Sequence, residues 1–594
     1  MKLSKNSITI LRERYLLRNK DREIIETPSG MFRRVSKAVA EAEIKYNKSK
    51  TEISVLKKEF YSMLTNLYFL PNSPTLMNAG TKLGQLSACF VLPIDDDIDK
   101  IFQAVKYTAL IHKSGGGTGF SFCRIRPKND VVKSTGGKSS GPFSFMGVFD
   151  TATGVIKQGG KRRGANMVIQ RVDHPDIMDF ITSKKAESKE CPNCGIALRG
   201  GGFIPFSNCN LSVAITDKFI EAVKTDGDFE LINPRNGKVS KTMKARTIWS
   251  LLTYMSWNNG EPAVVFIDTM NKDNPTPEIG EFESTNPCGE TPLLPYESCN
   301  LGSINVSKFF KNRKNGNRID WEKLQKIVRL SVRFLDNVVD VNKYPLPEIE
   351  AATLANRKIG LGIMGWADLL LKMGIRYDSL EATKMAEKLM KFIQDEGRIM
   401  SRELGKERGN FPNKNKSIYK DEEYMRNATI TTIAPTGTIS IIADTSQGIE
   451  PIFAVVKTRN VKKSLGENLV EISPSVITSL RLKGLWNPEM EQALLSSQSK
   501  CLILPPEMKK ILVTAHEVSY EWHVRMVAAF QKYVDNAVSK TVNLNFDNSI
   551  NDVEQVYLLA HKLGCKGITV YRDGSRREQL LTKGTGIGGC KTCD

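Results

Sequence analysis

Histidine is scarce in this chain, with only five among 594 residues. None of the five forms an HExxH motif or a pair at metal-binding spacing, which disfavours hydrolytic zinc chemistry. Long apolar runs are absent as well, since no window approaches about 18 consecutive apolar residues. The N-terminal segment MKLSKNSITILRERYLLRNK has no run long enough for a signal peptide. We therefore expect a soluble, cytoplasmic protein without a membrane partner.

Cysteine content and charge narrow the chemistry further. Eleven cysteines, an odd number, do not suit a structural disulfide framework in a reducing compartment, so some of them should carry redox or metal chemistry. Lys and Arg number 85 against 65 for Asp and Glu, and the net charge of +20 favours polyanionic partners such as nucleotides, nucleic acid or anionic lipid. A lysine-rich solvated surface would give the same balance.

The composition divides the chain into three regions. Residues 1–70 carry apolar stripes at helical spacing and predict a small helical domain. Residues 71–575 alternate glycine-punctuated apolar runs with amphipathic helices, which predicts an α/β architecture with a largely parallel sheet or barrel. Residues 576–594 are polar and glycine-rich, so we expect a flexible tail. One predicted helix of the middle region has an apolar face made of Leu324, Ile327, Val328, Ser331, Phe334, Leu335 and Val338.

Two glycine-containing motifs suggest nucleotide binding. The run 360–365, GLGIMG, matches GxGxxG, but no hydrophobic strand precedes it, so we expect its glycines to let a barrel strand pack closely against a helix. The run 435–440, PTGTIS, follows an apolar stretch and offers hydroxyl and backbone N–H groups that suit a phosphate. An ordinary Thr-rich turn is the alternative for this second motif.

Two CxxC pairs point to different chemistry. Cys590 and Cys593 lie in the tail without further zinc ligands nearby, which favours a dithiol that exchanges with other disulfides. Cys191 and Cys194 precede Cys209 and could belong to a metal site, but three cysteines leave a tetrahedral zinc ion one ligand short. We therefore assign no metal ligand.

The loop STNPCGETPLLPYESCN, residues 284–300, concentrates reactive groups. In an extended segment Asn286, Cys288 and Glu290 project to the same side, so amide, thiol and carboxylate would converge on one substrate. The carboxylate can take a proton, the amide can orient a hydroxyl, and the sulfur can act as nucleophile or radical. A thiol protease would need a histidine here, and none accompanies this loop. Cys299 follows a Pro-Leu-Leu-Pro turn and is expected on an adjacent strand of the same barrel.

The same loop carries a family resemblance. NPCGE followed by SCNLGSINV, with SPTLMNAGTKLGQLSACFVLPIDD upstream and APTGTISIIADTSQGIEP downstream, closely resembles the catalytic subunit of ribonucleotide reductases. The segments AFQKYVDNAVSKTVNLNF and LAHKLGCKGITVYRDGSR resemble the adenosylcobalamin-dependent class II enzymes in particular. The similarity covers residues 10–580 and keeps the motifs in family order. It implies a ten-stranded α/β barrel with a central finger loop that carries Cys288.

The resemblance also implies roles for five catalytic residues. Cleavage of the cobalt–carbon bond of adenosylcobalamin would produce a thiyl radical at Cys288, which removes the 3′ hydrogen of a ribonucleotide. Glu290 would deprotonate the 3′ hydroxyl, and Asn286 would bind the substrate hydroxyls. Cys89 and Cys299 would supply the electrons as a dithiol, with Cys89 protonating the departing 2′ hydroxyl. Their disulfide would then exchange with the tail pair, Cys590 and Cys593, which a thioredoxin-like protein reduces.

Binding positions follow from the same resemblance, carried over by position. Substrate contacts are expected at Ser73, Ala88, Cys89, Gly117, Asn286, Pro287, Cys288, Gly289, Glu290, Pro435, Thr436, Gly437, Thr438 and Ile439. A deoxynucleoside triphosphate that selects the substrate would bind at the interface of a homodimer, with phosphate on Arg126 and Lys133 and sugar on Asp96. Loops 133–143 and 157–166 would read and transmit its identity. Mg²⁺ would accompany the bound nucleotides.

The radical source can be chosen among the family's classes. Class I enzymes use a Tyr-Tyr pair near the C-terminus, where this chain has Val570 and Tyr571, and no glycyl-radical motif ends the chain. Asp173-His174-Pro175 does not match DxHxxG, so cobalamin would bind without a histidine ligand. The chain also begins almost at LRERYLL, without the ATP-sensing domain that often starts the family, so we expect no overall inhibition by dATP.

Three competing hypotheses are weaker. A class I-like subunit that needs a metal-containing partner is the alternative within the family. A zinc-bearing nucleic-acid-binding protein would explain the charge but leaves NPCGE without a role, so no direct nucleic-acid binding is expected. A nicotinamide dehydrogenase built on residues 360–365 suffers from the same objection.

Overall fold

The computed structural model describes residues 3–158, 162–184, 206–312, 318–459, 469–496, 504–576 and 581–583. Within these ranges no helix has both the length and the apolar character needed to cross a membrane.

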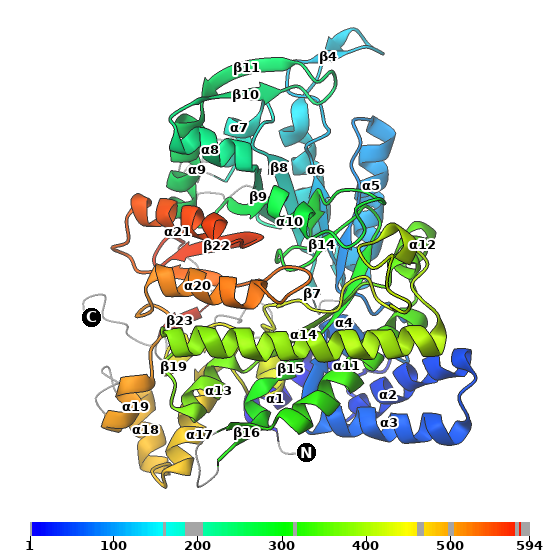
Figure 1. The fold of residues 1–594 in the computed structure, drawn as a ribbon, viewed down its shortest axis with the longest axis vertical. Helices are drawn as coiled ribbons and strands as arrows, with labels where there is room; N and C mark the ends of the chain where they lie inside the picture. Colours follow the sequence, from blue (N-terminus) through cyan, green and yellow to red (C-terminus); the bar gives the residue numbers. More distant parts are fainter. Residues whose placement is uncertain are drawn as a thin grey trace.

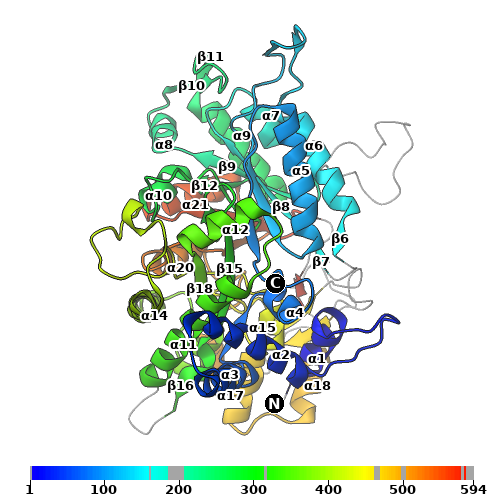
Figure 2. The same cartoon turned by 90° about the vertical axis from the view of Figure 1, so that its right-hand side faces the viewer.

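Residues 3–65 form a helical layer, shown in blue in Figure 1. Its helices are α1 (Lys5–Ile10), α2 (Pro28–Ala40) and α3 (Lys50–Thr65). The predicted stripe of α2 is buried at Met31, Val35 and Val39, and α3 begins with a capping box in which Ser49 and Glu52 satisfy each other's backbone N–H groups. Both helices pack on α11 (Trp321–Val341), as Figure 2 shows.

A ten-stranded sheet forms the centre of the molecule and confirms the predicted α/β barrel. Nine strands follow one another in the order β1, β15, β2, β3, β8, β9, β12, β22 and β21, and β18 pairs with β15. Their bounds are β1 Phe69–Pro71, β2 Cys89–Val91, β3 Gly117–Ser121, β8 Asn166–Arg171, β9 Cys209–Ile215, β12 Ala263–Phe266, β15 Ser298–Asn305, β18 Ile359–Met364, β21 Thr541–Leu544 and β22 Gly567–Arg572. Neighbours from β2 to β12 are parallel. Bridges from Leu361 to Thr431 and from Ile433 to Val538 continue the ring between β18 and β21.

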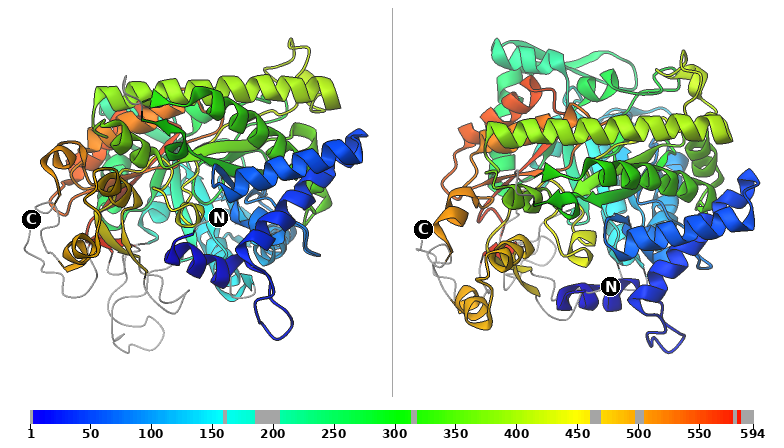
Figure 3. Two further views of the ribbon diagram at one scale, coloured as in Figure 1. Left: turned by 90° about the horizontal axis from the view of Figure 1, so that it is seen from below. Right: turned by 60° about the horizontal axis from the view of Figure 1, so that its bottom comes forward.

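Amphipathic helices cover the outside of the barrel. The longest is α14 (Leu380–Arg408), which runs along one side of the molecule and is yellow-green in Figure 3. It packs on α11, whose predicted apolar face is buried as expected. Further covering helices are α5 (Ile98–Lys113), α6 (Gly141–Val155), α9 (Ala245–Asn259), α20 (Tyr520–Gln531) and α21 (Ile550–Lys562).

Gly360 and Gly362 of GLGIMG lie within strand β18 and allow a close approach of backbone. A Cβ at Gly362 would lie 2.2 Å from the carbonyl oxygen of Thr432, and one at Gly360 would lie 2.7 Å from the Thr432 side chain. The expectation that these glycines face a helix was therefore wrong, because their neighbour is the extended segment around Thr432. Gly365 precedes α13 (Trp366–Met373), but Gly360 and Gly362 belong to the strand and do not form a phosphate-binding turn after it.

A smaller unit follows the barrel segment 430–450. Helices α17 (Pro474–Leu482), α18 (Pro488–Ser496) and α19 (Pro506–Ile511) share a separate apolar core. Beside them β19 (Val456–Arg459) pairs with β20 (Leu469–Ile472) and with β23 (Leu581–Lys583). Strand β23 belongs to the predicted tail; Cys590 and Cys593 lie outside the described residues.

Candidate active site

Asn286 to Thr291 form the tip of a hairpin, whose strands are β13 (Ser284–Thr285) and β14 (Pro292–Leu293). The N–H of Gly289 donates to the Asn286 carbonyl at 3.0 Å, and the Thr291 N–H donates to Asn286 Oδ1 at 3.0 Å. Gly289 has φ 82°, a backbone conformation that favours glycine. The expectation of an extended segment was therefore wrong: a tight turn, and not strand alternation, brings Asn286, Cys288 and Glu290 together.

The hairpin lies directly on the inner face of β3. A Cβ at Gly119 would lie 1.7 Å from the Thr285 carbonyl oxygen, and one at Gly117 would lie 2.8 Å from the ring of Pro287. Only glycine leaves room for this contact. From β9, Asn210 donates its Nδ2 to the Pro287 carbonyl at 2.7 Å. The tip is therefore held by two strands that are distant from it in the sequence.

The reactive side chains of the tip differ in exposure. Asn286 and Glu290 are buried, whereas Cys288 is exposed. The carbonyl of Glu290 accepts hydrogen bonds from Ala537 N at 2.9 Å and Thr432 Oγ1 at 2.8 Å. These contacts fix the backbone of Glu290, whose side chain is buried, while Cys288 is exposed at the turn.

Cys89 and Cys299 lie opposite each other on the antiparallel strands β2 and β15. Such cross-strand partners have Cα atoms about 4.5–5.5 Å apart, within the range that a disulfide spans. Both are free thiols, 2% and 0% exposed. Thr291, from the hairpin, donates to Cys89 Sγ at 3.8 Å, so the thiol pair sits beside the tip. The structure therefore supports the predicted pairing of these two cysteines.

Burial dominates the electrostatics of the thiol pair. It raises the pKa of Cys89 well above its ordinary value, and nearby Glu290, Cys299 and Cys288 raise it further. Burial also raises the pKa of Cys299, although Lys358 opposes the shift. Both groups are therefore protonated at neutral pH and can donate a proton.

A buried ion pair supports the dithiol strand. Lys358 Nζ lies 2.6 Å from Glu297 Oε2, and both side chains are almost completely buried. The same carboxylate accepts from Leu294 N at 2.7 Å and from Asn356 Nδ2 at 2.5 Å. Lys358 also lies over the ring of Phe282, 4.7 Å from its centroid. The ion pair thus links Phe282, before the hairpin, and Leu294, after it, to Glu297, directly before strand β15.

The predicted phosphate loop begins next to the dithiol. Ala434 shares an apolar cluster with Cys89, Cys299 and Leu301, against which Ala88 packs. Thr436 has φ 55° and its Oγ1 accepts from Gly448 N at 2.8 Å, after which the loop enters the short helix α15 (Ile439–Ile442). This arrangement brings the start of the Pro435–Ile439 run close to Ala88, Cys89 and Gly117, which pairs with Cys89.

Ser73 lies at the start of α4 (Ser73–Asn78), directly after β1. Its hydroxyl shares a 2.7 Å hydrogen bond with the phenol of Tyr15. The preceding residue, Asn72, donates its N–H to the Leu301 carbonyl on β15. The residue before Ser73 is therefore bonded to the dithiol strand, and the substrate contact expected of Ser73 stays a prediction.

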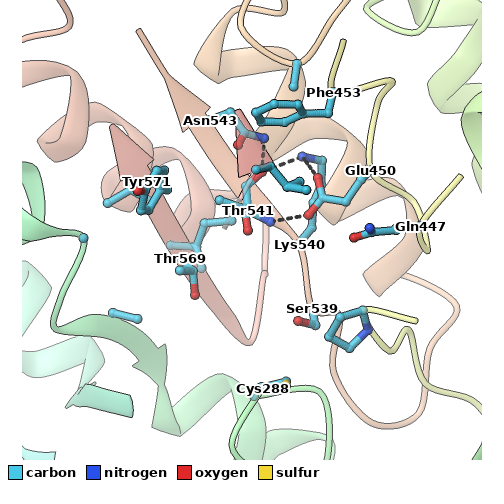
Figure 4. Close-up of a pocket in the computed structure, with 18 of the residues that line it drawn as sticks. Cys288, Gln447, Glu450, Phe453, Ser539, Lys540, Thr541, Asn543, Thr569 and Tyr571 are labelled. Atoms are coloured by element: carbon cyan, nitrogen blue, oxygen red, sulfur yellow. Dashed lines mark hydrogen bonds and ion pairs between the residues drawn. The ribbon is translucent and has the colours of Figure 1, made fainter. Parts of the chain in front are cut away.

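A cavity of about 540 Å³ opens on the other side of the hairpin tip. Pro287, Cys288 and Gly289 line it, whereas Cys89, Cys299 and Glu290 do not. Figure 4 shows Cys288 at one end, below a wall formed by residues that include Gln447, Glu450, Phe453, Ser539, Lys540, Thr541, Asn543, Thr569 and Tyr571. The tip therefore separates an enclosed dithiol from an open cavity.

Sequence reasoning missed the polar wall of this cavity. Glu450 Oε2 lies 3.0 Å from Lys540 Nζ, and the Lys540 side chain is completely buried. Neither residue stands in a recognisable spacing pattern, and the contact joins positions 90 apart in the sequence. The motif TSQGIEP contains Glu450 but does not indicate its partner.

The predicted effector residues are brought together near α5. Arg126 Nε lies 2.7 Å from Asp96 Oδ2, and Arg126 Nη1 donates to the Val131 carbonyl at 2.9 Å. Lys133 is exposed in the hairpin of β4 (Val131–Val132) and β5 (Gly137–Lys138). Arg126 and Asp96 thus pair with each other in this structure, so the assignment of one to phosphate and the other to sugar stays a prediction.

Metal binding finds no support in the part of the chain that the structure describes, where no cluster of His, Cys, Asp or Glu could hold an ion. Cys209 is buried at the start of β9 with its pKa raised to about 12 by burial. Cys191 and Cys194 lie outside the described residues. His174 is also buried and shares a hydrogen bond with the Ile125 carbonyl, and burial lowers its pKa.

Family comparisons agree with this geometry. Residues 87–571 match the family described as "Ribonucleotide reductase, barrel domain", and residues 1–84 match "Ribonucleotide reductase, all-alpha domain". The chain belongs to the ribonucleotide reductase family. The resemblance carried by the NPCGE loop is thereby confirmed.

Relatives indicate which member it resembles. The chain is 46% identical to a protein of Thermoplasma acidophilum, over 98% of this chain and 81% of that one, and 44% identical to one of Mycobacterium tuberculosis strain CDC 1551 with the same coverage. Both are named vitamin B12-dependent ribonucleoside-diphosphate reductase. The alpha subunit of the Actinobacillus ureae class Id ribonucleotide reductase shares the fold, with a TM-score of 0.75 at 24% identity over 96% of this chain and 97% of that one.

Proposed function

We propose that this chain is an adenosylcobalamin-dependent ribonucleotide reductase that makes 2′-deoxyribonucleotides for DNA synthesis. One observation carries the proposal: Cys288 stands at a hairpin tip between an open cavity and the buried pair Cys89 and Cys299. A sulfur in this position can exchange hydrogen atoms with a group in the cavity and with a substrate on the dithiol side. The names of the similar relatives support cobalamin as the ligand that binds in the cavity.

Residues of the chain account for each proton and electron. Cys288, as a thiyl radical, takes the 3′ hydrogen atom of the ribonucleotide while Glu290 accepts the 3′ hydroxyl proton. The 2′ oxygen leaves as water with a proton from Cys89. The hydrogen of the second thiol goes to the 2′ carbon as Cys89 and Cys299 give up two electrons and become a disulfide. Glu290 returns its proton to the 3′ oxygen, and the hydrogen atom on Cys288 returns to the 3′ carbon. Asn286 and the loop 435–439 orient the hydroxyls and phosphates.

The cavity suits a large cofactor. It combines aromatic side chains (Phe453, Tyr571) with amide and hydroxyl groups (Gln447, Ser539, Asn543), which match the apolar and carboxamide surfaces of a corrin. These residues would hold the group and keep water from Cys288. When bound, adenosylcobalamin supplies homolytic chemistry that can remove a hydrogen atom from a thiol. Binding without a histidine ligand to cobalt stays a prediction, and His516 also lines the cavity.

Reduction of the Cys89–Cys299 disulfide requires a shuttle, because both sulfurs are enclosed. We assign this step to Cys590 and Cys593, reduced in turn by a thioredoxin-like protein. Changing both to serine should spare turnover with a small dithiol and stop it with thioredoxin. Equal activity with either reductant would exclude the tail as the shuttle.

A homodimer fits the exposed apolar side chains next to the predicted effector residues. Ile98, Phe102 and Leu110 on α5 and Phe143 on α6 are exposed although large and hydrophobic. A second copy packed on these two helices would cover them and complete a site for a deoxynucleoside triphosphate, with Mg²⁺, at Asp96, Arg126 and Lys133. Phe102→Glu should lower the dimer fraction measured by light scattering and weaken effector binding together. A cytoplasmic location stays a prediction.

Turnover by the purified chain tests the proposal. Anaerobic enzyme with adenosylcobalamin, a small dithiol and each ribonucleoside diphosphate or triphosphate should form deoxynucleotide without any second protein. The alternative, a class I-like subunit, predicts no product until a metal-containing partner is added. Absence of product and of a cobalt-coupled paramagnetic signal with cofactor, effector and substrate would overturn the proposal.

A further inference from the structure

Lys540, Glu450 and His523 form a hydrogen-bonded cluster at the cavity wall, and Figure 4 shows Lys540 and Glu450 on the side away from Cys288. Lys540 Nζ lies 3.0 Å from Glu450 Oε2, 2.7 Å from His523 Nδ1 and 2.7 Å from the Thr541 carbonyl. The Lys540 side chain is 0% exposed, and His523 is likewise buried. These three contacts use all three N–H groups of the ammonium.

The protonation of the cluster follows from its hydrogen bonds. His523 Nε2 lies 3.0 Å from the Ala515 carbonyl, which can only accept, so this nitrogen carries the proton and Nδ1 accepts from Lys540. Burial and the neighbouring ammonium lower the pKa of His523 well below its ordinary value, which keeps the ring neutral. The carboxylate of Glu450 is therefore the anionic partner that compensates the buried charge of Lys540.

Glu450 faces the cavity in front of this cation. Its Oε1 accepts from Thr541 N at 2.8 Å and its Oε2 accepts from Lys540, so the carboxylate is fixed at both oxygens. Its side chain is 24% exposed and lines the cavity. Each carboxylate oxygen has a further lone pair, so the group can still accept hydrogen bonds from a ligand.

The residues around Glu450 indicate which chemical class of ligand it binds. Phe453 and Tyr571 line the same cavity and offer aromatic surfaces to a flat heterocycle. An acidic side chain that accepts from ribose hydroxyls beside such surfaces is a general device of nucleoside recognition. Since the dithiol does not line this cavity, the nucleoside in it is not the one that undergoes reduction.

We propose that Glu450, held in place by Lys540, accepts hydrogen bonds from the ribose hydroxyls of the nucleoside group of the bound cobalamin. This inference rests on the proposed function. It makes Glu450 a determinant of which upper ligand the cavity accepts, and Lys540 a positioning residue that acts through Glu450.

Equilibrium binding to the full chain, followed by visible absorption, tests the inference without turnover. Adenosylcobalamin is compared with methylcobalamin, which has no nucleoside as upper ligand. Glu450→Gln should raise the Kd of adenosylcobalamin about tenfold or more, because hydrogen bonds to a charged group are lost, and leave that of methylcobalamin within about twofold. Lys540→Met should act in the same direction. Glu387→Gln, which removes the carboxylate of an exposed pair with Lys532, serves as control and should change neither.

A cobalamin whose nucleoside lacks the 2′ hydroxyl gives a second arm that does not depend on Lys540→Met folding. The wild type should bind it more weakly than adenosylcobalamin, whereas Glu450→Gln should bind both alike. Equal weakening of adenosylcobalamin and methylcobalamin by Glu450→Gln, or no weakening of either, would overturn the inference. If the wild type binds neither cobalamin, the proposed cofactor is wrong and the inference falls with it.

Discussion

The two sides of the hairpin tip contrast sharply in exposure. On one side Cys288 opens to a cavity of about 540 Å³. On the other, Cys89 and Cys299 are 2% and 0% exposed, and burial raises the pKa of both. One turn of six residues, Asn286 to Thr291, separates them.

This difference suits the two halves of the proposed chemistry. The exposed sulfur can meet a large cofactor, whereas the enclosed thiols stay protonated, which slows their exchange with thiols in solvent. A short hairpin packed on β3 separates these two environments. Five changes, in decreasing order of expected effect, would break or sharpen the contrast.

Cys288→Ser should abolish deoxynucleotide formation, because the hydroxyl does not replace the S–H group as a hydrogen-atom donor. Nucleotide binding should persist, since the change is confined to one exposed atom. Product assays and equilibrium binding check both statements. Cys123→Ser, at a partly exposed thiol outside the site, is the matched control; measurable turnover by Cys288→Ser would contradict the assignment.

Cys299→Ser should stop repeated turnover while Cys288 keeps its ability to exchange the 3′ hydrogen. The variant retains one thiol of the pair, which cannot supply two electrons as a disulfide. Product per enzyme and exchange of a 3′ hydrogen label separate the two steps. Continued turnover would show that Cys299 is not part of the reductant.

Glu290→Gln should lower kcat by about 10²–10⁴, the usual contribution of a positioned base. KM should change little, because the backbone carbonyl of residue 290 keeps its contacts with Ala537 and Thr432. Steady-state kinetics distinguishes these effects. A rise in KM with unchanged kcat would instead indicate a role in binding alone.

Gly119→Ala should lower kcat by about 10- to 100-fold, since a displacement of about 1 Å at a site is known to cost this much. The new Cβ would lie 1.7 Å from the Thr285 carbonyl and must push the hairpin off β3. Gly147→Ala on α6 is the control, because nothing lies within 4 Å of its Cβ position. Full activity of Gly119→Ala would show that the contact with β3 does not position the tip.

Alkylation should reveal the difference in exposure between Cys288 and the two buried thiols. Between pH 7 and 9 iodoacetamide should modify Cys288 in the native protein but leave Cys89 and Cys299 unmodified. Thiolates react, and the raised pKa of both buried thiols means that they ionise only above this range. Peptide mass spectrometry locates the label, and urea-unfolded protein should be labelled at all three positions. Labelling of Cys89 in the native state would refute its enclosure.

Local patterns predicted much of the fold because they depend on neighbours in the chain. The apolar face of α11 is buried as its spacing indicated, and Ala434, directly before the run Pro435–Ile439, lies in one apolar cluster with the dithiol. The extended form expected for Asn286 to Glu290 failed because Gly289 adopts a positive φ and Asn286 Oδ1 closes the turn. Neither the positive φ of Gly289 nor the hydrogen bond of Asn286 can be recognised from the pattern of residue types in the sequence.

The amino-acid sequence alone specified the chemistry: a thiol between an amide and a carboxylate, two further cysteines and a threonine-glycine turn in a recognisable order. Folding settled which groups share an environment. Cys89 meets Cys299 across two strands, and Lys540 meets both Glu450 and His523 at the cavity wall. The physical reason is that exposure and charge pairing depend on contacts between residues tens to hundreds of positions apart, and local periodicity carries no information about such contacts.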